Sequence, residues 1–180
     1  MMNVRNVIKL AVGLLFLTLV SWIVIKVMRK EDKSQIEYIS AIPSVDLMDT
    51  HYNTVSLDSL ISDAKHYILV FYSPGCLFCE HEAADLSRNK NEFKDRKVVF
   101  ITQESIDSAI AYSIRHNLMA VDNFHVLVDT SYSILPQFGI KMIPTTLIYD
   151  EKKEFVTSFE GEVNAKRILK ILVREQEEQF

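Results

Sequence analysis

Both cysteines of this 180-residue chain lie in one short motif, Cys76-Leu77-Phe78-Cys79, directly after the helix-breaking Ser73-Pro74-Gly75. An apolar run precedes the motif and a helical pattern follows it. In the first turn of a helix, residues i and i+3 share one face, so the two sulfurs can bond. Unpaired backbone N–H groups and the helix dipole favour a thiolate at Cys76, and a thiolate is what attacks disulfides. The motif therefore predicts a redox-active pair, with Cys76 as the nucleophile and the more buried Cys79 as the resolving thiol.

Three other roles for the cysteines fit the sequence less well. Inert core cysteines would be unusual at a strand-to-helix junction that follows Pro74-Gly75. A zinc site built from Cys76, Cys79 and His81 lacks a clear fourth ligand, so we expect no metal here. A purely structural disulfide would close a very short loop, which removes little entropy from the unfolded chain.

Strands and helices alternate along the rest of the chain. The strands are continuous apolar runs, which is typical of strands covered on both faces. Helices are indicated directly after the cysteines, by Ile106, Ile110 and Ile114 at a spacing of four, over residues 131–138 and from Ala165 onward. The expected strands are 67–72, 97–102, 124–128, 145–149 and 154–159. This alternation predicts an α/β fold, and the hairpin formed by the last two strands makes the sheet mixed.

A second feature, Ile143-Pro144-Thr145, stands directly before one of these apolar strands. Proline is tolerated at the first residue of a strand. By itself the tripeptide predicts only an ordinary trans proline that begins a strand.

Charge is distributed unevenly along the chain. Residues 1–40 hold six basic and three acidic residues, a formal charge of +3. The remaining residues hold 14 basic and 21 acidic side chains, a formal charge of −7. An acidic body argues against a nucleic-acid partner. The length suits a single domain with a sizeable core.

Residues 10–25 form an uncharged apolar run, which its flanks extend to a span over 7–28. A bilayer-spanning helix needs about 20 such residues. The alternative, a cleaved signal peptide, lacks a small-x-small cleavage site after the run. We therefore expect residues 1–28 to be a retained membrane anchor or an uncleaved signal, with the bilayer contacting residues 7–28.

The segment after the apolar run is charged and polar. Residues 29–40 are predicted to be a linker to a domain over 41–175, followed by a tail over 176–180. More basic residues follow the run than precede it, so the positive-inside rule does not place the N-terminus in the cytoplasm.

Taken together, these residues resemble the thioredoxin superfamily. The resemblance rests on the strand before the Cys-x-x-Cys motif, on Ile143-Pro144-Thr145 about 65 residues later, and on a hairpin, Gly161 and a terminal helix. More narrowly, the chain is similar to the membrane-anchored ResA/TlpA-type thiol–disulfide oxidoreductases of bacteria. The narrower features are an N-terminal hairpin (43–49 and 55–60), an inserted strand and helix (124–140), and Glu82 three residues after the second cysteine.

The resemblance implies a three-layer fold over roughly residues 41–175, with a central mixed sheet, helices on both faces and one preceding transmembrane helix. It implies that Pro144 is cis beside the disulfide and that the Ile143 backbone pairs with a substrate strand. It also implies that Glu82 holds or relays the proton that exchange requires. The remaining implied substrate contacts are Gly75, Leu77 and Phe78.

Three departures from the superfamily are visible. Gly75 stands where thioredoxins usually carry tryptophan, which removes a flat apolar docking surface that Phe78 replaces only in part. Val70 stands where thioredoxin has a buried aspartate, so Glu82 is the only nearby acid. The Leu77-Phe78 pair matches neither group, which leaves the direction of electron flow open.

The implied function is an oxidoreductase at the bacterial inner membrane, with its catalytic domain on the periplasmic, extracytoplasmic side. It would reduce protein disulfides with electrons from a membrane donor protein, in cell redox homeostasis and cytochrome c maturation, with no cofactor beyond the Cys76–Cys79 disulfide. Two alternatives stay open: a metal or haem chaperone using the thiols with His81 or His125, and a non-catalytic docking protein. A peroxiredoxin would need threonine three residues before its cysteine, where this chain has Ser73.

Overall fold

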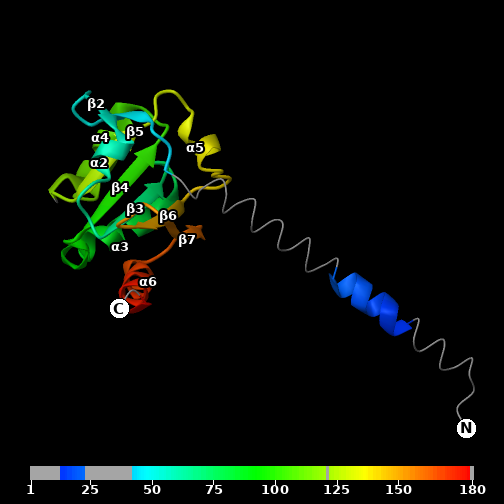
Figure 1. Cartoon of the computed structure of the whole chain (residues 1–180). Coiled ribbons are helices and arrows are strands. Elements are labelled where there is room, and N and C mark those ends of the chain that lie inside the picture. The colour runs from blue at the N-terminus through cyan, green and yellow to red at the C-terminus, as the bar shows by residue number, and fades with distance from the viewer. Residues whose placement is uncertain (1–12, 23–41, 121, 179–180) are drawn as a thin grey trace, which may run out of the picture. The chain divides into compact units, whose positions relative to one another are not determined.

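The computed structural model of the chain describes residues 13–22, 42–120 and 122–178 (Figure 1). The chain divides into two units, 1–38 and 39–180. In the first unit a helix covers residues 13–22. No helix within the described residues is long and apolar enough to span a membrane. The expected span over 7–28 lies partly outside those residues, and the expected linker over 29–40 lies entirely outside them.

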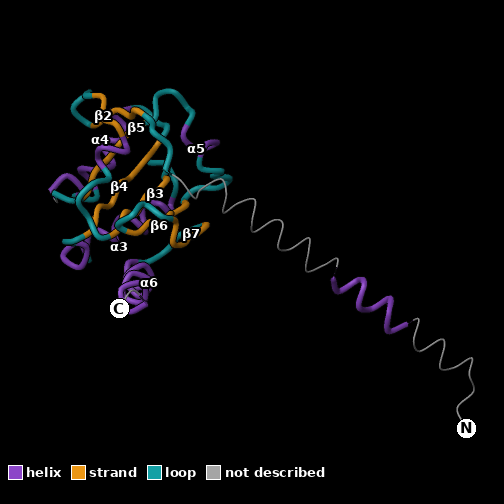
Figure 2. The backbone as a smooth tube through the Cα atoms, in the orientation of Figure 1, coloured by secondary structure: helices purple, strands orange, loops and turns teal. Residues whose placement is uncertain are grey.

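The second unit is built on a seven-stranded mixed sheet in the order β2-β1-β5-β4-β3-β6-β7 (Figure 2). Strands β3, β4 and β5 are parallel, and every other pairing is antiparallel. The strands are β1 (Asp46–Asp49), β2 (Thr54–Ser56), β3 (His66–Phe71), β4 (Arg96–Thr102), β5 (Phe124–Val128), β6 (Thr145–Asp150) and β7 (Phe155–Glu160). The predicted α/β fold with a mixed sheet is confirmed.

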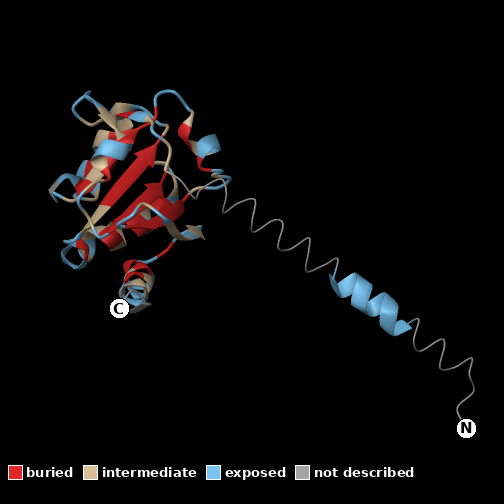
Figure 3. Cartoon of the chain, in the orientation of Figure 1, coloured by how far each residue is buried: buried red, intermediate tan, exposed pale blue. Residues whose placement is uncertain are grey.

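Helices cover both faces of this sheet, as predicted. On one face, α3 (Leu77–Arg88), α4 (Ile106–Arg115) and α6 (Ala165–Glu178) pack over alternate residues of the central strands. On the other face lie the short helices α2 (Leu57–Leu60) and α5 (Ile134–Gln137). Two 3-10 turns, η1 (Lys90–Phe93) and η2 (Leu118–Ala120), complete the elements. Strands β3 and β4 are buried between the helices (Figure 3) because both of their faces are covered.

Two details differ from the sequence expectations. The N-terminal hairpin forms, but its second arm is a strand only over β2, and Leu57–Leu60 coil into α2. In α4 the isoleucines that mark the helix are buried only in part, because Ile106 packs against the core whereas Ile114 is 68% exposed. The residues that α4 buries are instead Ala109, Tyr112 and Ser113.

Beyond the carboxyl end of β5, a buried aspartate holds the loop that leads toward Pro144. Asp129 accepts hydrogen bonds from the backbone N–H of Ser131 (3.0 Å) and of Ile134 (2.8 Å). It also accepts bonds from the Ser131 hydroxyl (2.6 Å) and the Gln103 amide (2.9 Å). Burial opposes ionisation of this carboxyl, but the four hydrogen bonds outweigh burial and hold its pKa below the usual range.

We expect Asp129→Ala to lower the free energy of unfolding by roughly 2–4 kcal/mol, because it leaves buried N–H donors without an acceptor. Urea unfolding at neutral pH measures the loss. Asp46→Ala, which removes an exposed carboxylate at the start of β1, is the matched control and should change stability by about 0.5 kcal/mol at most. Equal losses in the two variants would contradict this role of Asp129.

Candidate active site

The two thiols lie at the amino end of α3, as the sequence predicted. Cys76 is the N-cap residue of the helix, and its Sγ accepts a hydrogen bond from the backbone N–H of Cys79 at 3.4 Å. Both cysteines are free thiols. Cys76 is half-buried, whereas Cys79 is buried. The outer sulfur is thus the accessible one, and it faces the unpaired N–H groups of the first turn.

Burial makes the inner thiol a poor acid. Burial raises the pKa of Cys79, and its hydrogen bond with Cys76 and the nearby charge of Glu82 act in the same direction. A backbone hydrogen bond from Ser73 opposes these effects without outweighing them. Cys79 therefore needs a base close by before its sulfur can attack as a thiolate.

A buried carboxyl group lies one turn further along α3. Glu82 is only 1% exposed, although acidic side chains on helices are normally solvated. Its Oε1 accepts a hydrogen bond from the Thr146 hydroxyl at 2.5 Å, and its Oε2 accepts one from the Val163 N–H at 3.5 Å. Burial raises the pKa of Glu82 to about 7, while the two hydrogen bonds pull it down and Glu162 adds to the rise. Glu82 is thus poised to exchange a proton near neutral pH.

The loop before β6 completes the site. The Ile143–Pro144 peptide bond is cis, which confirms the expectation drawn from the resemblance. Antiparallel pairing sets Thr145 opposite Phe71 at the end of β3, so this loop meets the chain that leads to Cys76. Pro144 is buried, its carbonyl accepts a hydrogen bond from the Gly161 N–H at 2.8 Å, and Ile143 packs against the core layer that also contacts Cys76.

Apolar side chains are exposed next to the thiols. Leu77 is 65% exposed and Phe78 is 59% exposed, both in the first turn of α3. Met142, which the sequence analysis did not single out, is also exposed, and its position directly before Ile143-Pro144 was the available signal. A Cβ added to Gly75 would meet no atom within 4 Å, so the space above the motif is open.

Tyr112 of α4 is a further site residue, which no sequence pattern indicated. Its hydroxyl donates a hydrogen bond to the backbone carbonyl of Cys79 at 2.7 Å, and its ring is buried. The isoleucine spacing correctly indicated the helix but carried no information on which of its residues contact α3. A tyrosine two positions from an isoleucine carries no sequence signal for a contact with a residue 33 positions away.

The two histidines named as ligand candidates lie apart in the fold. His81 is exposed, and its Nδ1 lies 3.6 Å from an oxygen of Glu162. His125 lies on β5, where burial lowers its pKa. Among the residues that the structure describes, no three His, Cys, Asp or Glu side chains form a group able to hold a metal ion.

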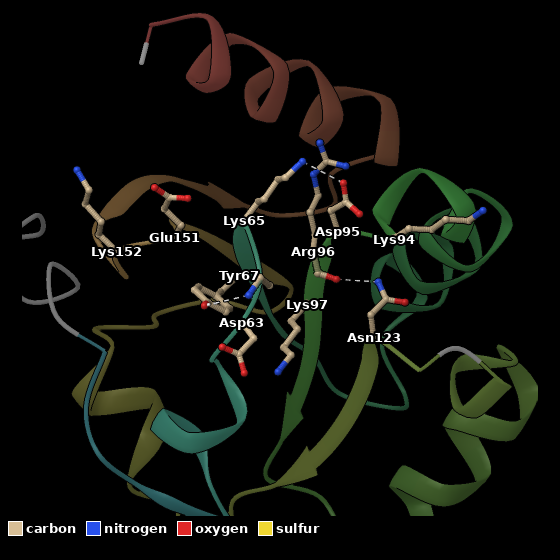
Figure 4. Close-up of a pocket in the computed structure, with 11 residues that line it drawn as sticks. Asp63, Lys65, Tyr67, Lys94, Asp95, Arg96, Lys97, Asn123, Glu151 and Lys152 are labelled. Atoms are coloured by element: carbon tan, nitrogen blue, oxygen red, sulfur yellow. Dashed lines mark hydrogen bonds and ion pairs between the residues drawn. The ribbon is translucent and has the colours of Figure 1, made fainter. Parts of the chain in front are cut away.

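A hollow of about 820 Å³ lies at the opposite edge of the sheet, where β3 and β4 begin (Figure 4). It shares no residue with the thiol site. Its charged lining residues are Asp63, Lys65, Lys94, Asp95, Arg96, Lys97, Glu151 and Lys152. The candidate active site is therefore the surface around Cys76.

The chain is similar to proteins of known family and fold. A sequence model of the AhpC/TSA family matches residues 40–157. The thiol-disulfide oxidoreductase ResA of Halalkalibacterium halodurans is 24% identical over 118 residues, which are 64% of each protein. The match thus spans slightly less than two thirds of that relative. The oxidoreductase class expected from the sequence agrees with the relative's name.

Solved structures share the fold. A secreted Mycobacterium tuberculosis disulfide oxidoreductase homologous to E. coli DsbE superposes with a TM-score of 0.62 at 18% identity, covering 77% of this chain and 98% of that one. Peroxidoxin BcpB from the same organism superposes with a TM-score of 0.64 at 19% identity, covering 74% and 94%. At this level of identity the likeness establishes the thioredoxin-type fold alone.

We expect the buried carboxyl of Glu82 to make stability depend on pH. The pKa of Glu82 is about 7 in the folded chain, and it takes its ordinary value of 4.5 in the unfolded chain. Between these pH values the folded chain therefore retains a proton that the unfolded chain releases. Stability of the native protein therefore falls as pH rises from 4.5 to 7. Relative to Glu82→Gln, the fall should be roughly 3 kcal/mol, at about 1.4 kcal/mol per pH unit.

Urea unfolding of the native protein and Glu82→Gln at pH 4.5 and pH 8 measures this difference. Glu160→Gln, which changes an exposed carboxylate on β7, is the matched control and should show no such pH dependence. The prediction would be contradicted if the free energies of unfolding of the wild-type protein and of Glu82→Gln differed by the same amount at both pH values.

Proposed function

Because the chain belongs to the AhpC/TSA family and carries its only two thiols at a helix start, we propose that it is a thiol–disulfide oxidoreductase. One observation carries the proposal. An accessible sulfur at the N-cap of α3, a buried sulfur one turn deeper and a buried carboxyl one turn deeper again follow each other along a single helix. These three groups supply a nucleophile, a resolving thiol and a proton acceptor.

The first step joins the protein to its substrate. The Cys76 thiolate attacks one sulfur of a substrate disulfide, and the substrate S–S bond breaks as the mixed disulfide forms. The second substrate sulfur leaves with the bonding electron pair and takes up a proton. Backbone N–H groups at the start of α3, including that of Cys79, stabilise the attacking thiolate.

The second step releases the substrate. Glu82 in its ionised form accepts the proton of Cys79, whose burial otherwise keeps it a thiol. The Cys79 sulfur then attacks Cys76, the Cys76–Cys79 bond forms, and the bond to the substrate breaks. The displaced substrate sulfur leaves with the bonding electron pair and takes up the proton that Cys79 gave to Glu82. The substrate is then a dithiol, reduced by two electrons, and the protein holds the disulfide.

The substrate is an extended, apolar segment of another protein. Exposed Leu77 and Phe78 offer apolar contact on one side of Cys76, and the open space over Gly75 admits a bulky side chain. On the other side the backbone at Ile143 pairs with the segment as an added strand. Pro144 separates that backbone from β6.

Trapping a mixed disulfide tests the proposal. In Cys79→Ala the first step proceeds but the second cannot, so a mixed disulfide should accumulate on non-reducing gels and disappear with dithiothreitol. The native protein should reduce insulin disulfides when supplied with dithiothreitol, and Cys76→Ala should do neither. If Cys79→Ala traps nothing and the native protein leaves insulin unreduced, the proposed function is wrong.

The proposal extends to location and partners. Residues 7–28 anchor the chain in the bacterial inner membrane, with the thiol domain on the periplasmic side, and a membrane donor protein supplies electrons. The uncharged run over 10–25 supports the membrane anchor. Apocytochrome c, whose haem-attachment thiols must stay reduced, is one substrate of this class.

Thiol labelling tests the orientation, because both cysteines of the chain lie in the active site. In spheroplasts, a maleimide that cannot cross the membrane should label Cys76 after mild reduction without any permeabilisation. The Cys76→Ala, Cys79→Ala double variant is the control and should stay unlabelled. Labelling that appears only after the membrane is opened would place the domain in the cytoplasm and overturn this part of the proposal.

A further inference from the structure

Helix α4 reaches the thiol pair through one buried hydroxyl group. The Tyr112 hydroxyl donates to the backbone carbonyl of Cys79 at 2.7 Å, and Tyr112 is fully buried. This carbonyl belongs to the resolving residue itself. The contact therefore joins an element outside the motif directly to the residue that must move its sulfur onto Cys76.

The bond is additional to those that the helix requires. Within an α-helix the carbonyl of residue i accepts the N–H of residue i+4, and Cys79 lies inside α3 with Ala83 in that position. A carbonyl oxygen has two lone pairs, so it accepts the tyrosine as well. Because α3 does not need Tyr112 to form, the extra bond instead fixes where the Cys79 peptide lies.

The Tyr112 ring is itself held from two sides. It stacks on the Tyr72 ring with centroids 4.3 Å apart, and it lies against the His116 ring with centroids 4.6 Å apart. His116 Nε2 is 2.6 Å from Glu80 Oε2, and Arg115 Nε is 3.3 Å from the same oxygen.

Glu80 directly follows Cys79 on α3. Together these interactions form a closed ring of contacts, which runs from the Cys79 carbonyl through Tyr112 and His116 back to the adjacent residue of α3. A closed ring of this kind restrains the first turns of α3 against α4 more firmly than a single bond would.

We infer that Tyr112 is a positioning residue for the second step of the proposed exchange, on which this inference rests. Its hydrogen bond holds the Cys79 peptide so that the buried sulfur lines up with Cys76 in the mixed disulfide. Thiol–disulfide exchange needs the attacking sulfur to be well oriented toward the bond that breaks. The first step uses Cys76, the N–H groups at the start of α3 and the substrate. It uses neither the Cys79 sulfur nor the Cys79 carbonyl, so the loss of the Tyr112 bond leaves its rate unchanged.

The neighbouring tyrosine provides a matched pair of variants. Tyr112→Phe and Tyr72→Phe each remove one buried hydroxyl from one stack of rings and leave the rings in place. Only the Tyr112 hydroxyl has a hydrogen-bond partner, because the buried Tyr72 hydroxyl has none in the described part of the chain. A difference between the variants therefore reports on the bond to Cys79.

The experiment is a rapid-quench reaction of the reduced full chain with a peptide disulfide, which follows the mixed disulfide as it forms and decays. In Tyr112→Phe the decay should slow by roughly tenfold while formation keeps the native rate. Tyr72→Phe should keep both rates within about twofold of native. His116→Leu, which opens the ring of contacts behind Tyr112, should slow the same decay by roughly threefold.

The outcomes separate this inference from the proposed function. If the native protein forms no mixed disulfide and reduces no peptide, the proposed function fails and the inference fails with it. If the native protein turns over but decay in Tyr112→Phe is as fast as native, only the inference is overturned. Equal slowing of formation and decay would also overturn it, because that pattern indicates a general loss of structure. Should Tyr112→Phe not fold, a native decay rate in His116→Leu overturns the inference.

Discussion

A carboxyl group buried beside a buried thiol is the constraint around which this domain is organised. Taking Glu82 out of water raises its pKa to about 7 and costs stability once it ionises. The structure offsets part of that cost with hydrogen bonds from Thr146 and Val163, which lie on β6 and just before α6. Glu82 therefore ties the last third of the domain to α3, together with Asp85, whose Oδ2 accepts a hydrogen bond from the Ala165 N–H at 2.7 Å. Glu82 is also the proton acceptor of the proposed chemistry.

Sheet topology brings the remaining parts to one place. Strand β3 lies between β4 and β6, and β6 runs antiparallel to it, so β6 begins where β3 ends. The register sets Thr146 opposite Val70, two residues before the chain turns toward the cysteine motif. Thr146 also donates a hydrogen bond to Glu82, so the carboxyl of α3 meets the sheet beside Val70.

The sequence was sufficient for the parts that local patterns determine. Continuous apolar runs located β3, β4 and β5, and the helix breaker before Cys76 located the start of α3. It was insufficient to predict the burial of a side chain that depends on a contact between residues far apart in the chain. Nothing local distinguishes Glu82 from an ordinary exposed acid on a helix, and its burial follows from Thr146, 64 positions away. Likewise, the three isoleucines are the most conspicuous apolar residues in the sequence of α4. The residues that pack against α3 and the sheet include Ala109, because its side chain is small, and Tyr112, through its aromatic ring.

Fold alone does not select the reaction, because a disulfide oxidoreductase and a peroxidoxin superpose on this chain almost equally well. What differs between such chemistries is the set of groups around the reactive sulfur. Here a second sulfur stands one turn away, so a bond formed at Cys76 can be displaced from within the same helix. That displacement requires a proton to leave a thiol whose pKa burial has raised, and Glu82 is placed to accept it. The arrangement favours exchange between disulfides over any reaction that ends at a single sulfur.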